Sequence, residues 1–104
     1  MHFDKVGFIG LGLIGGSIAR KMKENNPKVS IIATAGHQKT IEDAFELGLI
    51  DNNELLELNS FKDCDVIFLC APVNKNIESL TQLKDIIKDD CIITDAGSVK
   101  GPIH

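Results

Sequence analysis

The sequence predicts a single α/β domain in which a parallel, doubly wound sheet carries helices on both faces. Short β-branched runs alternate with amphipathic stretches, which is the pattern of consecutive strand–helix–strand units. The run from Asp65 to Cys70 has apolar residues for both faces, as a central strand of a parallel sheet requires. The chain has 104 residues, of which 43% are apolar and 25% charged, so it can bury the core of one domain.

The first half of the chain is predicted to form a strand, a helix and a second strand. Ile14, Ile18 and Met22 recur at intervals of four residues, which gives the helix one apolar stripe. Pro27 then ends this helix. The predicted elements of this half are a strand at Lys5–Gly10, a helix from Leu13 to about Asn25 and a strand at Val29–Thr34.

A second helix is predicted to open at Thr40. Its hydroxyl can cap the free amides of the first turn, and Asp43 follows three residues later, as in a capping box. The residues expected to face the sheet are Ile41, Ala44, Phe45 and Gly48. The remaining predicted elements are a short strand at Leu49–Ile50, a helical turn at 54–58, a strand at Asp65–Cys70, a helix marked by Ile77, Leu80, Leu83 and Ile87, and a strand at Cys91–Asp95.

Charge and hydropathy narrow the class of protein. Eleven Lys and Arg against fifteen Asp and Glu give a formal net charge of −4, which argues against a nucleic-acid surface. The longest apolar run, Val66–Pro72, is too short to cross a bilayer, and the first residues lack the pattern of a secretory signal. We therefore expect a cytoplasmic protein with neither a membrane nor a nucleic acid as its partner.

The cysteines predict neither a disulfide framework nor a metal site. Cys64, Cys70 and Cys91 are odd in number and show no Cys-x-x-Cys spacing. Buried, reduced thiols are the expected state of all three.

A glycine-rich turn follows the first strand and precedes the first helix. In a G-x-G-x-x-G pattern the first glycine permits the tight turn, the second lets the backbone approach a pyrophosphate, and the third allows close helix packing. The helix amino terminus offers unpaired amides to the phosphates. The alternative is a glycine-rich turn without a ligand. The predicted cofactor-binding residues of this turn are Gly10, Leu11, Gly12, Leu13, Ile14 and Gly15.

The end of the second strand lacks the acidic residue that usually binds the adenosine ribose. The position falls at Thr34 or Ala35, and the segment that follows includes His37 and Lys39. We expect this loop to favour the 2′-phosphate of NADP slightly over NAD, with His37 and Lys39 near the phosphate. The alternative is that backbone groups hold a plain NAD ribose while Lys39 is merely solvated.

The later strand ends contribute two more candidate segments, because ligands of open α/β sheets bind beyond the carboxyl ends of the strands. The turn Cys70, Ala71, Pro72 and Val73 is predicted to lie along the nicotinamide, although Pro72 is equally consistent with a simple end to the strand. After the last strand, Ser98 can bind a substrate hydroxyl and Lys100 a substrate carboxylate. Ser98 can equally cap a following helix.

The chain resembles the prephenate dehydrogenases of tyrosine biosynthesis, from about Val6 to its last residue. The segments that carry the resemblance are Gly10–Ser17, Glu46–Asp51, Cys70–Val73 and, above all, Thr94–Gly101. The resemblance implies a Rossmann-type fold and NAD(P)-dependent oxidative decarboxylation of prephenate to 4-hydroxyphenylpyruvate, with arogenate as the substrate of some members. It also implies that Ser98 binds the ring hydroxyl and orients a catalytic histidine that lies beyond it.

The chain departs from the family pattern in two ways. The acidic residue after the second strand is missing, and the sequence stops at His104, to which we assign no role. We therefore expect residues 1–104 to be an incomplete NAD(P)-binding domain, truncated before the helical domain, with little or no activity alone. The resemblance implies that the whole enzyme is a homodimer through that helical domain.

Two other functions fit parts of the sequence. A relative of pyrroline-5-carboxylate reductase would share the glycine turn and a second strand end suited to NADP, but not the segment around Ser98 and Lys100. A non-catalytic nucleotide-sensing module would suit the short chain, but it would leave these same two residues unexplained.

Overall fold

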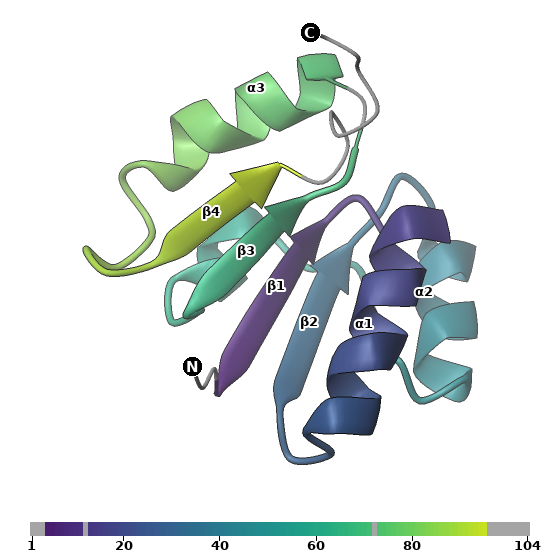
Figure 1. Ribbon diagram of the computed structural model, residues 1–104. Helices are drawn as coiled ribbons and strands as arrows, with labels where there is room; N and C mark the ends of the chain where they lie inside the picture. The colour runs from purple at the N-terminus through teal and green to yellow at the C-terminus, as the bar shows by residue number, and fades with distance from the viewer. Residues whose placement is uncertain (1–3, 12, 72, 96–104) are drawn as a thin grey trace, which may run out of the picture.

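The computed structural model describes residues 4–11, 13–71 and 73–95. Within these ranges, the strands form one parallel sheet in the order β2-β1-β3-β4 (Figure 1). The strands are β1 (Lys5–Ile9), β2 (Ser30–Thr34), β3 (Val66–Leu69) and β4 (Ile92–Asp95). The predicted fold class is confirmed: this is a Rossmann-like doubly wound sheet.

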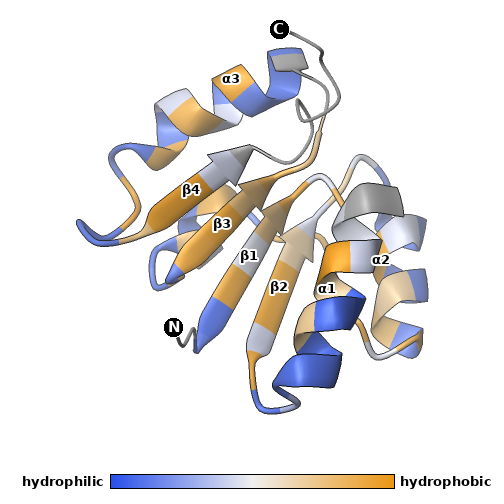
Figure 2. Ribbon diagram, in the orientation of Figure 1, coloured by the Kyte–Doolittle hydropathy of each residue, from blue (hydrophilic) through white to orange (hydrophobic). Residues whose placement is uncertain are grey.

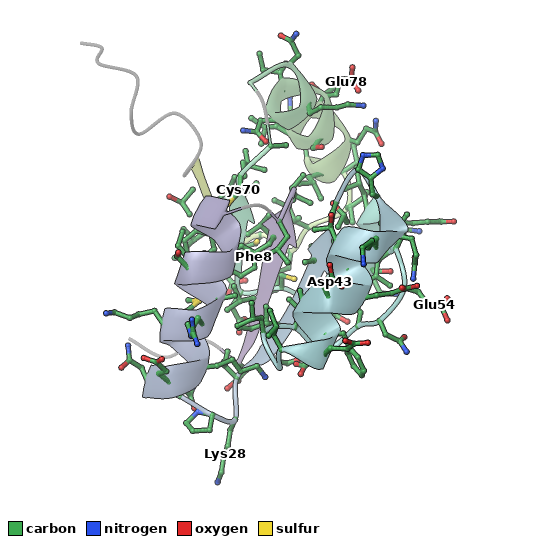
Figure 3. All side chains as sticks on the ribbon, turned by 90° about the vertical axis from the view of Figure 1, so that its right-hand side faces the viewer. Phe8, Lys28, Asp43, Glu54, Cys70 and Glu78 are labelled. Carbon is green, nitrogen blue, oxygen red and sulfur yellow. The ribbon has the colours of Figure 1, made fainter. Side chains whose placement is uncertain are left out.

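Helices cover both faces of the sheet. The helical elements are α1 (Leu13–Asn25), α2 (Gln38–Glu46), the short 3-10 helix η1 (Leu58–Phe61) and α3 (Val73–Leu83). On one face, Ala19 of α1 and Ile41 of α2 pack with Val6 and Phe8 of β1 in one buried cluster. Figure 3 shows Phe8 between α1 and α2.

The opposite face is covered by η1 and by the end of α3. Phe61 and Leu83 are fully buried there and pack with Ile67 and Leu69 of β3. A Cβ at Gly7 would lie 2.3 Å from the Phe61 ring, so β1 needs a glycine where η1 crosses it. Figure 2 shows the result as a mainly apolar sheet between more polar helices.

The first half of the chain largely follows the prediction. Helix α1 has the predicted bounds, and the strands β1 and β2 are each one residue shorter than expected. Helix α2 begins at Gln38 rather than at Thr40, and its N-cap, His37, makes no side-chain capping bond. The Gln38 side chain explains the earlier start, because it bonds Glu42 one turn on and two backbone groups of the loop at 53–55. The expected capping box is therefore wrong.

The connection from α2 to β3 differs most from the prediction. No strand forms at Leu49–Ile50. Asp51 nevertheless lies along the free edge of β2, where its amide donates to the Ile31 carbonyl at 2.7 Å and its Oδ2 accepts from the Ile31 amide at 2.8 Å. The main chain and the side chain of Asp51 thus form hydrogen bonds with this edge in place of a neighbouring strand. The helical turn expected at 54–58 does not form; the 3-10 helix η1 begins only at Leu58 and continues to Phe61.

Several predicted apolar positions face solvent. Phe45 is 42% exposed, so only Ile41 and Ala44 of α2 are buried, and Gly48 lies beyond the end of the helix. Helix α3 ends at Leu83, four residues before Ile87, and its Ile77 is 60% exposed.

Candidate functional site

The candidate site lies where the sheet changes its direction of winding. The β1–α1–β2 connection moves to one side of β1, and the next connection crosses back over β1 to reach β3. The carboxyl ends of these three strands therefore meet around a crevice. Ligands of open parallel α/β sheets bind at such a switch point.

A cavity of about 500 Å³ opens at this edge. It combines the ends of β1, β2 and β3 with the first turns of α2 and α3. The residues that line it are Ile9, Gly10, Leu11, Thr34, Ala35, Gly36, Thr40, Cys70, Ala71, Lys75 and Ser79.

The floor of the pocket is the turn after β1. The amides of Gly10 and Leu11 both donate to the Thr34 carbonyl, at 3.0 and 2.9 Å, which fixes the turn to the end of β2. Gly10 has a φ of +84°, which residues with a Cβ rarely adopt. A Cβ at Gly10 would also lie 2.6 Å from the Cβ of Ala71. Position 10 therefore requires glycine for two reasons: its φ is positive, and a Cβ there would collide with Ala71.

The β3–α3 turn is held by a buried amide side chain. Asn76 is 3% exposed, and its Oδ1 accepts from the Ala71 amide at 3.1 Å. Its Nδ2 donates to the Ala71 carbonyl at 2.8 Å and to the Leu69 carbonyl at 3.5 Å. These bonds fix Ala71 against Gly10 and fix the rotation of the first turn of α3. Figure 3 shows Cys70 of the same turn beside the beginning of α1.

The charge of the pocket is positive among its described lining residues. Lys75 is the cation among them, and no carboxylate is present. Thr34, Thr40 and Ser79 supply hydroxyls. This lining suits a ligand with phosphates and several hydrogen-bonding groups.

The sequence-predicted residues divide into three groups. Those that line the pocket are Gly10, Leu11, Thr34, Ala35, Cys70 and Ala71. Those not among its described lining residues are Gly15, His37 and Lys39, together with Leu13, Ile14 and Val73, which are described only as helix backbone. Those outside the described residues are Gly12, Pro72, Ser98 and Lys100.

Two of these residues have exposed side chains. Lys39 has an 82% exposed side chain that pairs with Asp43 at 3.5 Å, and it does not reach the lining. His37 is exposed at the start of α2. The loop after β2 therefore presents small residues and Thr40 to the pocket rather than its basic side chains.

Sequence reasoning missed the contribution of α3. Lys75 and Ser79 are four residues apart and so share one face of the helix. That spacing is visible in the sequence, but only the placement of α3 shows that this face borders the pocket. Asn76 carried no signal, because an asparagine near a helix start is usually a surface residue.

Among the described residues, no group of three or more His, Cys, Asp or Glu side chains is placed to hold a metal ion. In the same ranges, no helix is long and apolar enough to cross a membrane.

The fold and the pocket together define a nucleotide-binding domain of the Rossmann type. The sequence profile of the family described as "Prephenate dehydrogenase, nucleotide-binding domain" matches residues 18–104. The chain belongs to this family. The match covers α1 from its second turn onward and begins after the glycine turn.

Known proteins agree with this assignment. A prephenate dehydrogenase of Lactococcus lactis subsp. cremoris is 37% identical over 101 residues, which are 95% of this chain and 28% of the relative. The crystal structure of an arogenate dehydrogenase from Synechocystis is similar with a TM-score of 0.78 and 33% identity, over 95% of this chain and 34% of that one.

A third relative was solved with its ligands. The prephenate dehydrogenase from A. aeolicus, in complex with hydroxyphenyl propionate and NAD+, has a TM-score of 0.82 and 27% identity, over 94% of this chain and 35% of that one. The present chain thus spans 28–35% of the length of these three proteins. The comparisons favour a prephenate dehydrogenase over the reductase and the sensor module.

Proposed function

We propose that this chain is the nicotinamide dinucleotide-binding part of an NAD(P)-dependent prephenate dehydrogenase. The observation that supports this most is the pocket at the switch point, whose floor is formed by Gly10 and Ala71. The NAD+ complex of the A. aeolicus relative supports the choice of ligand.

The residues of the pocket fit such a ligand. The Gly10 turn brings the end of β1 against Ala71, and α1 begins beside it at Leu13 with the partial positive charge of a helix amino terminus, which can attract a phosphate. Thr34 and Thr40 can bind ribose hydroxyls. The small residues Cys70 and Ala71 leave room for a flat ring. When bound, the nicotinamide would supply the hydride acceptor.

For the whole enzyme we propose oxidative decarboxylation of prephenate, or of arogenate. In that reaction hydride would leave the hydroxyl-bearing ring carbon for the nicotinamide, and the ring carboxylate would depart as carbon dioxide. The electron pair of the broken carbon–carbon bond would complete the aromatic ring, whose hydroxyl keeps its proton. Ser98 would bind that hydroxyl, and Lys100 would attract a carboxylate. We propose that a helical domain in the rest of the enzyme completes this site, joins two subunits into a homodimer, and that the enzyme works in the cytoplasm.

The choice between NAD and NADP rests on charge. No acidic residue lines the end of β2 among the described lining residues, so nothing there repels a 2′-phosphate, and we propose a slight preference for NADP. Gly36 allows a direct test. It lines the pocket, its φ is not positive, and a Cβ there would meet nothing within 4 Å.

We expect isothermal titration of this chain to show binding of both NAD+ and NADP+. Gly36→Asp should weaken NADP+ binding by about tenfold, because the carboxylate repels the 2′-phosphate, and should leave NAD+ binding equal or tighter. Gly36→Asn, which has the same size without the charge, is the matched control and should change the ratio of the two affinities little. Absence of binding of either nucleotide to the wild-type chain would refute the proposed function.

The activity is tested separately from binding. Protein that joins this domain to the helical domain should form NAD(P)H when given prephenate, whereas the chain alone should form little or none. Robust prephenate-dependent turnover by residues 1–104 alone would show that the proposed division of the site is wrong.

A further inference from the structure

The cation in the described lining of the pocket comes from α3, on the opposite side from the loop after β2. Lys75 lies on the first turn of the helix, with Ser79 one turn further on the same face. The adjacent Asn76 is buried and bonded to the backbone of Leu69 and Ala71. Because Asn76 fixes the rotation of this turn, the direction in which Lys75 leaves the helix is also fixed.

The basic residues after β2 do not supply this charge. Lys39 pairs with Asp43 on the exposed side of α2 and does not line the pocket. The loop side of the pocket instead presents Ala35 and Gly36, which have no charge and little bulk. A phosphate placed on that side would have open space at Gly36, and the cation available to it among the described lining residues would be Lys75.

The strand order keeps the distance between the loop after β2 and the helix after β3 short. The ends of β2 and β3 are separated only by the end of β1, and neighbouring strands are about 5 Å apart, so these two strand ends lie about 10 Å from each other. A lysine carries its ammonium on a flexible four-carbon stem and can extend from α3 over much of this distance.

We infer that Lys75 is the residue through which this pocket selects a dinucleotide with an additional phosphate on its adenosine ribose. The ammonium of Lys75 forms a charge-assisted hydrogen bond with that phosphate, and Ser79 offers its hydroxyl to the same part of the ligand. This inference rests on the proposed function, because it assumes that the pocket binds a nicotinamide dinucleotide.

The test uses two probes that differ only in the presence of the 2′-phosphate on the ribose: 2′,5′-ADP carries it, and 5′-AMP lacks it. Titrations of the chain with NADP+ and NAD+ accompany them. Lys75→Gln should weaken binding of 2′,5′-ADP and NADP+ by about tenfold or more, while 5′-AMP and NAD+ change less than about twofold. Lys75→Arg, which keeps the charge, should retain most of the selectivity.

Lys39→Gln is the matched control, since it removes a cation of the same type from the other side of the pocket. It should leave all four affinities nearly unchanged. Equal weakening of NADP+ and NAD+ in Lys75→Gln, or loss of selectivity in Lys39→Gln alone, would overturn the assignment while the proposed function stands. A wild-type chain that binds none of the four ligands would refute the proposed function itself.

Discussion

Asn76 shows how much of this site depends on a single polar side chain. Its amide group bonds the Ala71 amide and carbonyl and the Leu69 carbonyl, and it is buried while doing so. A buried backbone group that loses its partner costs more than the bond itself contributes, because the group stays desolvated. Asn76 therefore contributes both to the stability of the α3 amino terminus and to the position of Ala71 in the pocket floor.

Replacement of Asn76 by Ala should lower the free energy of unfolding by about 2 kcal/mol, since three backbone interactions lose their partner at once. Asn74→Ala is the control, because Asn74 is exposed on the same turn of the helix, and it should change stability by less than about 0.5 kcal/mol. Urea unfolding of both variants provides the measurement. Equal stability of the two would show that the bonds of Asn76 contribute nothing net.

Single residues were also where the sequence was hardest to interpret. The pattern Gly10 to Gly15 predicted the turn that forms the floor, because only glycine fits a close approach at positive φ. The roles of Lys39 and Lys75 were not predictable, since a lysine's partner depends on tertiary placement. Lys39 finds Asp43 one turn along its own helix, whereas Lys75 borders the pocket.

At the scale of elements, one carboxylate joins the beginnings of three strands. Asp65, just before β3, accepts hydrogen bonds from the amides of Asp4 and Lys5 at 2.8 and 3.1 Å and pairs with Lys88 before β4. The hydrogen bond from Lys88 and those from the two amides lower the pKa of Asp65 from 3.8 to about 2. The charged form of Asp65 is thus favoured in the folded protein.

This pKa predicts a dependence of stability on acid. Above about pH 4, Asp65 is charged in the folded and the unfolded chain, so its stabilisation is fully present; it is lost as the pH falls toward 2. Because the pair is partly exposed, we expect Asp65→Asn to cost about 1 kcal/mol at pH 6 and only a small part of that near pH 2. Denaturant unfolding at several pH values measures this difference.

The control for this prediction is Asp63→Asn, which removes an exposed carboxylate two residues away. Its effect should be small and should not follow the same pH profile. A constant difference between wild type and Asp65→Asn from pH 6 to pH 2 would contradict the assigned cause.

The elements that the sequence predicted well are those with strong hydrophobic periodicity or a β-branched run. Helix α1 and the four strands come from such segments, and the structure confirms them within a residue or two. The segment from Leu49 to Phe61 has neither. Its conformation depends on side-chain contacts such as those of Asp51 and Asn52 with the edge of β2, which local sequence does not encode.

At the scale of the whole molecule, the sheet divides the core into two clusters, one on each face. Cys64 lies in the cluster beneath η1, fully buried, and burial raises the pKa of its thiol from 9.0 to about 12. A thiol reacts as its thiolate. Cys64 should therefore react slowly for two reasons: reagents cannot reach the buried side chain, and the thiol stays protonated at neutral pH.

Alkylation of Cys64 should therefore report global unfolding. In native buffer at pH 8, its labelling by iodoacetamide should be far slower than that of the partly exposed Cys91, and should rise steeply with urea. Peptide mass spectrometry distinguishes the two sites. Labelling of Cys64 at the rate of Cys91, without dependence on denaturant, would mean that the η1 face opens locally.

The contact between Gly10 and Ala71 has a consequence for how this pocket can change. Because a Cβ at Gly10 would collide with Ala71, the ends of β1 and β3 meet with almost no side chain between them. The floor at this point is thus largely main chain, and any side chain at position 10 would force the two strand ends apart. Among the described lining residues, Gly36 and Lys75 stand at the walls, where substitution can change the ligand preference without meeting this contact. The space available at position 10 depends on the residue at position 71, so an engineer of this domain would leave both unchanged.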